Sequence, residues 1–162
     1  MAVLVLSVLS VGVFNLFYSN NFGADLSGDQ SLAMADVQKA LRAIAVDLRS
    51  GAAFATPTNS GGVRATFSSG SPIEYYRSGT TLYCLTDGTT PTTTTVVTGL
   101  TAGSGLTLTY YDSSMNAIAG PMTTTKYTQA AVVDVAIRIT LSHSVFGTVS
   151  RTTRVVLRNM VS

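Results

Sequence analysis

The first 24 residues constrain this chain more than any other feature, because they contain no charged side chain. Their apolar part runs from Met1 to Phe17 and is interrupted only by Ser7, Ser10, Gly12 and Asn15. As a helix it would span roughly 26 Å at 1.5 Å per residue, just short of the ~30 Å hydrocarbon core of a bilayer. The sequence therefore predicts a membrane helix over residues 1–24.

Two other interpretations of residues 1–24 stay open. A cleaved secretory signal has an apolar region of only about 7–15 residues, preceded by a cationic segment. Here no Lys or Arg precedes the apolar run, and no small-x-small cleavage site stands cleanly at its end. The third interpretation is that the chain begins inside a longer hydrophobic helix. These observations favour a membrane helix, complete or partial, over a signal peptide.

Charge is scarce in the whole chain, and this excludes several functions. Charged residues make up 11%, against about 25% in an ordinary soluble domain. The net charge of +2 is too small for a nucleic-acid clamp, which needs many clustered cations to displace counterions, so no nucleic-acid partner is expected. One cysteine and one histidine supply neither an internal disulfide nor a cysteine-based zinc site.

Neither of these two residues is predicted to be catalytic. His143 has no serine or cysteine motif around it, and Cys84 lies in a strand-like segment where a buried thiol is expected. The loop around Asp112 does not match a calcium-binding pattern. We therefore expect no enzyme activity, no cofactor and no metal.

A change in composition divides the chain at Ala55. Every threonine and all four prolines follow this residue, which marks residues 1–55 as helical, since threonine favours strands and proline breaks helices. An apolar stripe with helical spacing is predicted to pack against the rest of the protein, and Gly51 follows it as a stop signal: Met34, Val37, Leu41, Ile44 and Leu48. Residues 19–31 are either a loop between two helices or a weak point in one long helix.

From Val63 onward the apolar period changes to two, which predicts strands. They are expected at 63–67, 73–77, 81–85, 106–110, 133–141, 145–149 and 153–158, with a tight hairpin at Ser78-Gly79. Connectors rich in Gly, Ser and Thr are expected at 56–62, 87–95, 101–105 and 113–125. The threonine run 89–95 is either an exposed loop or strand edge, or an O-glycosylated patch. Strands after a single helix predict an α+β fold, with an antiparallel sheet packed on the amphipathic helix.

Several segments, taken in order, resemble one protein family. They are MAVLVLSVLSVGVFNLFYSNN, MADVQKALRAIAVDLRSG, IEYYRSGTTLYCLTDG, VVTGLTAGSGLTLTYYDSSMN, VAIRITLSHS and TRVVLRNM. Their order and spacing are similar to type IV pilins and type II secretion pseudopilins, and most of all to PilW-like minor pilins and J-type pseudopilins. The resemblance covers nearly the whole chain and implies the pilin fold, a long N-terminal helix packed on a β-sheet head.

The resemblance implies three parts: a transmembrane and filament-core helix over 1–24, an amphipathic helix over 25–52 and a β-rich head over 53–162. It implies a non-enzymatic minor subunit of a type IV pilus or secretion pseudopilus. The subunit would be held in the bacterial inner membrane with a periplasmic head before assembly. The implied partners are other pilin or pseudopilin subunits, inner-membrane lipid and the assembly machinery.

Residues of the apolar segment would form the filament core, where small side chains permit close approach of helices. They are Val3, Leu4, Leu6, Ser7, Leu9, Ser10, Gly12, Val13, Phe14, Asn15 and Phe17. The family's basic leader, cleavage-site Gly and Phe-Thr-Leu-Ile-Glu-Leu motif do not occur at Met1–Val5. The resemblance therefore implies about ten further residues of mature helix before Met1, which would carry the processed and methylated N-terminus.

One rival hypothesis keeps residues 1–24 as a simple anchor. The protein would then be a membrane-tethered extracytoplasmic β-domain that binds a ligand or partner without forming filaments. The sequence does not separate pilus from secretion pseudopilus.

Overall fold

The computed structural model describes residues 28–141 and 147–157, and it has a mixed fold of helix and antiparallel sheet. A helix over residues 28–49, called the first helix below, precedes the strands. The elements that follow are β1 (Ala53–Ala55), β2 (Val63–Thr66), β3 (Ile73–Ser78), β4 (Thr81–Thr86), β5 (Thr92–Val97), β6 (Leu106–Tyr111), α2 (Thr124–Gln129), β7 (Val132–Thr140) and β8 (Thr148–Val156).

The first helix buries the apolar stripe seen in its sequence. Val37, Ile44 and Leu48 are fully buried, Leu41 is buried, and Met34 is partly buried against the same core. Spacings of three and four place these side chains on one side of a helix, and burying that side provides most of its stability.

Gly51 allows the end of the first helix to lie close to the sheet. Its N–H donates to the carbonyl oxygen of Leu48 at 3.0 Å, which closes the last turn. A Cβ atom at this position would lie 3.0 Å from the Cβ of Ala65 on β2. Glycine therefore allows a close approach between the end of the helix and β2 that a larger residue would disturb.

The first sheet has five strands in the order β1-β2-β3-β4-β5, and every neighbouring pair is antiparallel. Strands joined in sequence order by short connections are the simplest antiparallel arrangement. The β3–β4 pair closes at Ser78 and Thr81, where Gly79 has a φ of +60°. Few side chains adopt this conformation, so the predicted hairpin at Ser78-Gly79 depends on the glycine.

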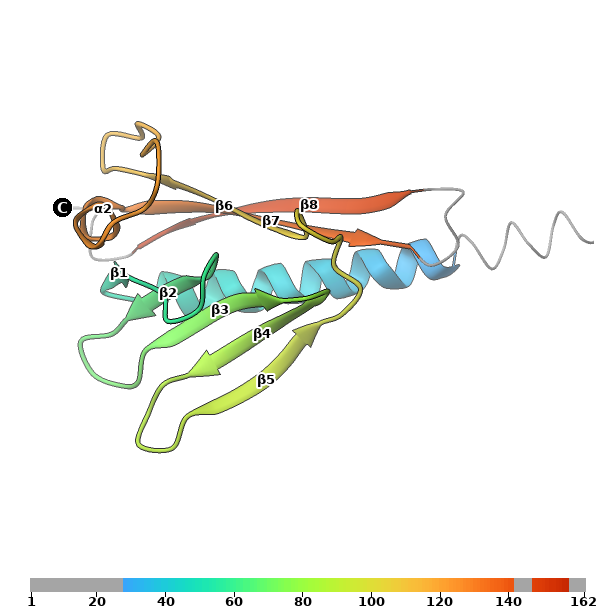
Figure 1. Cartoon of the computed structure of the whole chain (residues 1–162), viewed down its shortest axis with the longest axis horizontal. Coiled ribbons are helices and arrows are strands. Elements are labelled where there is room, and N and C mark those ends of the chain that lie inside the picture. The colour runs from blue at the N-terminus through green and yellow to red at the C-terminus, as the bar shows by residue number, and fades with distance from the viewer. Residues whose placement is uncertain (1–27, 142–146, 158–162) are drawn as a thin grey trace, which may run out of the picture.

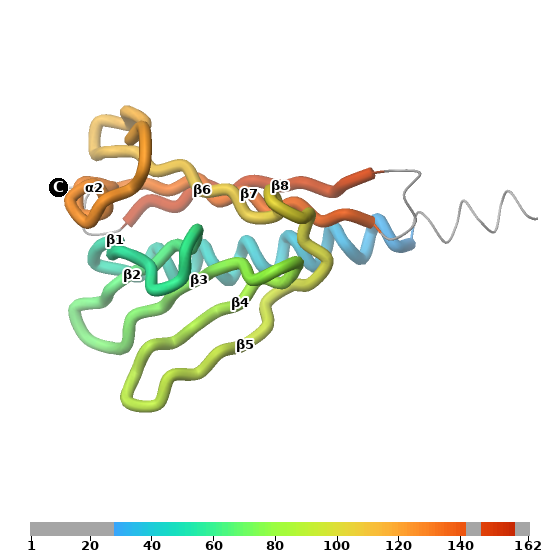
Figure 2. The backbone as a smooth tube through the Cα atoms, in the orientation of Figure 1, coloured from blue at the N-terminus to red at the C-terminus, as the bar shows by residue number. Residues whose placement is uncertain are grey.

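The second sheet has three antiparallel strands in the order β6-β7-β8. The chain passes from the first sheet to the second through residues 98–105, as the tube in Figure 2 shows. Backbone hydrogen bonds hold this passage to both sheets. The N–H of Leu100 donates to the carbonyl of Thr80, and that of Thr101 donates to the carbonyl of Arg138.

The first helix lies along the line where the two sheets meet, with one sheet on each side of it (Figure 1). Contacts to both sheets fix it there: the Tyr75 hydroxyl of β3 donates to Asp47, and Arg151 Nε of β8 lies 3.2 Å from Met34 Sδ. Where β1, β6 and α2 meet, the ring of Tyr110 packs edge-on against the rings of Phe54 and Tyr127. The ring centroids are 5.7 and 5.4 Å apart. The core therefore lies between the helix and the two sheets.

Several sequence predictions for the strands were wrong. A single sheet was expected, but the strands form two separate sheets. Residues 87–95 were expected as a connector, but Thr92–Val97 form strand β5. The strands expected at 145–149 and 153–158 are one continuous strand over the part that the structure describes, Thr148–Val156.

The helical prediction for residues 1–55 was also wrong at its end, because Ala53–Ala55 form strand β1. Residues 113–125 were expected to be a connector, but the last two of them begin the short helix α2, Thr124–Gln129. Of the open segment 19–31, residues 28–31 belong to the first helix, and residues 19–27 lie outside the described residues.

Candidate functional site

The uncovered side of the first helix is the first candidate for an interaction surface. Leu32 is 67% exposed and Val46 is 63% exposed on this helix. They are fourteen residues apart, almost four helical turns, so they lie along the same side of the helix. They are about 21 Å apart along the helix, so they stand singly and do not form one continuous apolar patch.

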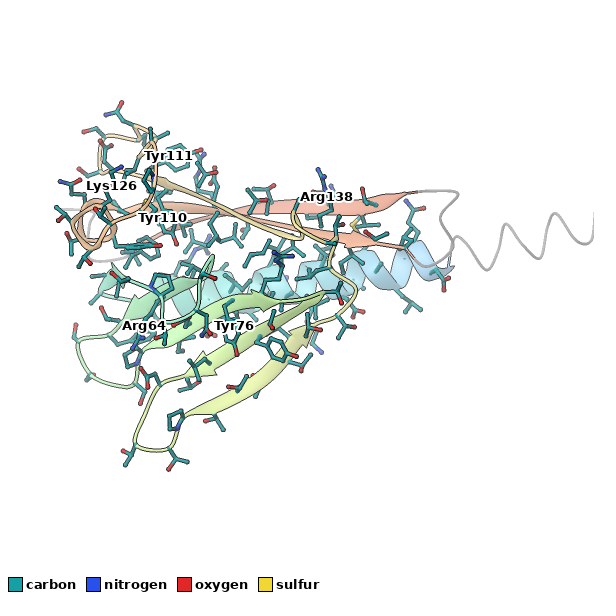
Figure 3. All side chains as sticks on the ribbon, viewed as in Figure 1. Arg64, Tyr76, Tyr110, Tyr111, Lys126 and Arg138 are labelled. Carbon is teal, nitrogen blue, oxygen red and sulfur yellow. The ribbon has the colours of Figure 1, made fainter. Side chains whose placement is uncertain are left out.

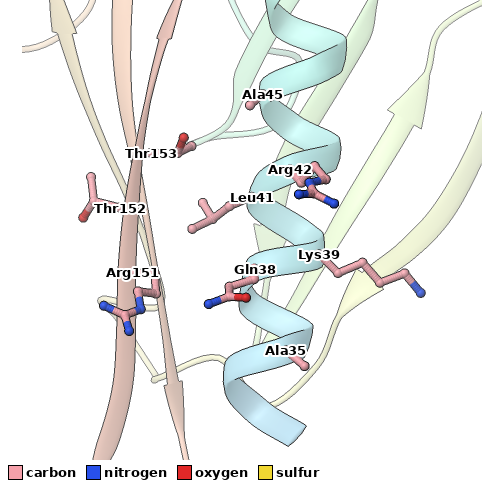
Figure 4. A pocket seen from close by; sticks show the side chains of 9 residues that line it. All are labelled: Ala35, Gln38, Lys39, Leu41, Arg42, Ala45, Arg151, Thr152 and Thr153. Carbon is pink, nitrogen blue, oxygen red and sulfur yellow. The ribbon is translucent and has the colours of Figure 1, made fainter. Parts of the chain in front are cut away.

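A groove of 610 Å³ lies beside this surface, between the first helix and strand β8. We call it the helix–β8 groove. It is lined by Ala35, Gln38, Lys39, Leu41, Arg42, Ala45, Arg151, Thr152 and Thr153. Figure 4 shows Gln38 and Leu41 pointing from the helix toward the strand, while the ammonium end of Lys39 points away from it.

The register of the second sheet explains why an arginine lines this groove. Arg151 is paired with Ile137 and Thr153 with Val135, and paired residues of antiparallel strands have side chains on the same face. Ile137 and Val135 are fully buried in the core. Arg151 and Thr153 therefore lie on the core face of the sheet but at its outer strand, where the first helix leaves them uncovered.

The cations of the groove have no acidic partner. Lys39, Arg42 and Arg151 form no ion pair with any residue in the described ranges. The Nε of Arg151 lies 3.2 Å from the sulfur of Met34, which is uncharged. The helix–β8 groove is therefore a positively charged hollow with the apolar side chains of Ala35, Leu41 and Ala45 in its lining.

A buried carboxylate forms a second polar cluster. Because Tyr75 points toward the helix, its neighbour Glu74 points to the opposite face of the sheet. There Glu74, only 1% exposed, accepts hydrogen bonds from the backbone N–H groups of Thr58 and Asn59 at 2.8 and 2.7 Å. Arg64 lies 3.7 Å from Glu74 and also pairs with Asp87. All the hydrogen bonds are internal, so this cluster holds the loop 56–62 against the sheet.

A third cluster lies on the outer face of the second sheet. Arg154 Nε and Nη2 each lie 2.6 Å from one oxygen of Asp134, and Tyr111 donates to Asp134 at 3.1 Å. The hydrogen bond from Arg154 lowers the pKa of Asp134. A carboxylate held in its charged form by a paired guanidinium is a poor general base, so this cluster links β7 to β8 rather than doing chemistry.

The tyrosines that the structure describes make contacts within the fold. Burial raises the pKa of both Tyr75 and Tyr110, which keeps their hydroxyls protonated as hydrogen-bond donors. Tyr76 and Tyr83 stack on each other across β3 and β4, with ring centroids 5.6 Å apart. Figure 3 shows Tyr110 and Tyr111 close together on β6 of the second sheet and Tyr76 on the first sheet.

The filament-core residues predicted from the sequence, Val3 to Phe17, lie outside the described residues, as does His143. Cys84 is a free thiol and is half-buried, less than expected; its pKa is raised by burial. Asp112 accepts hydrogen bonds from the backbone of Ser114 and Asn116 and so closes its own turn. Within residues 28–141 and 147–157, no cluster of His, Cys, Asp or Glu could hold a metal ion.

None of the helices that the structure describes is both long and apolar enough to cross a membrane.

Sequence comparison gives no assignment: no protein-family model matches the chain, and no curated protein matches it.

The helix–β8 groove was not predicted from the sequence. Arg42 and Arg151 are more than a hundred residues apart, and nothing local to either residue indicates the other. One signal was present in the sequence of β8, Thr148–Val156. Val149 and Val155 are buried, and alternation predicts apolar residues at the two positions of the same face between them, but these positions hold Arg151 and Thr153.

Proposed function

We propose that this chain is a non-enzymatic structural subunit of a filament, a minor pilin or pseudopilin of a type IV pilus or type II secretion pseudopilus. One observation supports the proposal most. An amphipathic helix over residues 28–49, packed between two antiparallel sheets, lies a few residues after a stretch of 24 residues without a charge. Such a helix can connect a segment dissolved in lipid to a head in water.

The mechanism that we propose uses one apolar surface in two environments. In the bilayer, a helix over residues 1–24 satisfies its own backbone hydrogen bonds and exposes apolar side chains to lipid. On assembly, the same side chains pack against the helices of neighbouring subunits, and Ser7, Ser10 and Gly12 allow close approach there. The polar Asn15 is placed to form a contact between helices. The head would remain outside the helical core and contact neighbouring heads.

A substitution at Gly12 tests this proposal. Gly12→Leu is expected to leave the chain in the membrane fraction, since leucine is more apolar, but to reduce its incorporation into filaments at least tenfold by blocking helix approach. Incorporation is measured by immunoblotting of sheared filaments after co-expression with the other filament components. Val11→Leu, at the neighbouring position, is the control and should incorporate normally.

Two results would contradict the proposal. In one, the unsubstituted chain never enters filaments although it is in the membrane, which would favour a tethered β-domain with the helix–β8 groove as its binding site. In the other, Gly12→Leu and Val11→Leu incorporate equally well.

A further inference from the structure

The helix–β8 groove combines features that a binding surface for an acidic polypeptide requires. We propose that it is the docking site for a segment rich in Asp and Glu that belongs to a different polypeptide, not to a second copy of this chain. The inference concerns the described head alone. Only the identification of that polypeptide as another filament subunit rests on the proposed function.

The charges of the groove come from two elements. Arg42 extends from the first helix and Arg151 from strand β8, and the side chain of Gln38 points from the helix toward the strand (Figure 4). The contact of Arg151 Nε with the Met34 sulfur holds the side chain in place but does not neutralise it. An arginine held in this way can donate two parallel hydrogen bonds to a carboxylate with little further loss of side-chain freedom.

The shape of the groove suits a polypeptide better than a single small anion. Its lining extends along the helix from Ala35 to Ala45, which is about 15 Å at 1.5 Å per residue. On its other side, β8 is the last strand of its sheet, so within residues 28–141 and 147–157 no strand pairs with one edge of its backbone. An extended segment could bond to this edge while its carboxylates reach the two arginines.

Most of the acids that the structure describes already have partners within the chain. Glu74 and Asp87 pair with Arg64, and Asp134 pairs with Arg154. Asp47 and Asp112 accept hydrogen bonds from their own chain, and Asp29 is also engaged.

Among the described acids this leaves Asp36, on the flank of the helix away from Arg42. No two of the eight acids of this chain are closer than four residues in the sequence, so a second copy has no Asp- and Glu-rich segment to offer. The acidic segment that we propose therefore belongs to a different polypeptide.

The test measures binding of a fluorescein-labelled oligo-glutamate peptide of about twenty residues to the full chain in a non-ionic detergent, by fluorescence anisotropy at low salt. We expect the double variant Arg42→Glu/Arg151→Glu to bind the peptide at least tenfold more weakly. The control is Arg138→Glu, which reverses the charge of one arginine, as each groove substitution does. Arg138 is exposed on the opposite face of the second sheet (Figure 3). It should change the affinity less than twofold.

A neutral pair, Arg42→Gln/Arg151→Gln, covers the case in which the reversed charges disturb folding. It should also weaken binding, with an unchanged circular dichroism spectrum. Equal losses in the Arg138 variant and in the groove variants would overturn the proposal, because the peptide would then respond only to net charge.

The nature of the occupant is tested in cells by a photo-crosslinking amino acid at Gln38. A crosslink to an Asp- and Glu-rich segment of another polypeptide, lost on adding Arg42→Glu/Arg151→Glu, supports the proposal. A crosslink to this same chain would overturn it. So would binding to phosphatidylglycerol vesicles that depends on the same two arginines and displaces the peptide. Failure of the chain to enter filaments would affect only the proposed function, because the peptide assay requires no filament.

Discussion

Replacing Leu48 with alanine is expected to lower the free energy of unfolding by about 2–5 kcal/mol, the usual range for truncating a buried leucine. Leu48 is fully buried in the last turns of the first helix, between the two sheets. Removing its methyl groups would leave a cavity that the surrounding strands cannot readily fill, because the helix contacts both sheets. Urea unfolding of the full chain in a non-ionic detergent, followed by circular dichroism, measures the change.

Val46→Ala is the matched control, since it truncates an aliphatic side chain on the same helix. Val46 is 63% exposed, so its replacement should change the free energy of unfolding by no more than about 0.5 kcal/mol. A comparable loss in both variants would mean that the helix is not packed on the sheets as described. No loss in either variant would lead to the same conclusion.

The second large effect is expected at Glu74. Glu74→Gln should lower the free energy of unfolding by about 3–5 kcal/mol, the cost of removing one partner from a buried, hydrogen-bonded charge pair. The carboxylate accepts from three N–H groups of Thr58 and Asn59 and lies near Arg64. An amide presents one donor where an acceptor is needed, so at least one of these N–H groups loses its partner.

Asp87→Asn provides the comparison, because Asp87 is the other carboxylate that pairs with Arg64. The Asp87 side chain is 40% exposed, and water can replace its contacts, so a change below about 1 kcal/mol is expected. Proteolysis at loop 56–62 gives an independent measure, since only the Glu74 variant should become susceptible there. If the two variants are equally stable, the buried carboxylate does not hold this loop.

The parts of the fold that were predicted correctly are determined by patterns among residues close together in the sequence. The burial of Val37, Ile44 and Leu48 follows from their helical spacing, because one side of a helix must be covered. Strand β7 follows from alternation in the same way, since Val133, Val135, Ile137 and Ile139 are all buried. The hairpin between β3 and β4 follows from a glycine that can adopt a positive φ.

The parts that were not predicted depend on partners distant in the sequence. The run Thr92–Thr95 has no apolar alternation and was read as a connector, but β4 supplies its hydrogen bonds and makes it a strand. The short helix α2 is rich in threonine, which has low helix propensity. Packing of Tyr127 on Tyr110, together with the cap at Thr123, stabilises it.

The division into two sheets could not be predicted for the same reason. Alternation indicates which residues form strands but not which strands pair with each other. The separation occurs at residues 98–105, where Leu100 bonds to the β3–β4 turn while Thr101 bonds to β7. The helix–β8 groove is a consequence of this division, because β8 becomes a sheet edge beside the first helix.

The proposed function requires that the mature protein keeps the uncharged segment 1–24. The mass of the mature protein tests this directly. The chain should be purified from the membranes and sheared filaments of its native cell and measured intact by mass spectrometry, with the N-terminal peptide sequenced. We predict a mature protein that retains residues 1–24 and is recovered from both fractions. A mature protein that starts after residue 24 and is recovered in the soluble fraction would contradict the account.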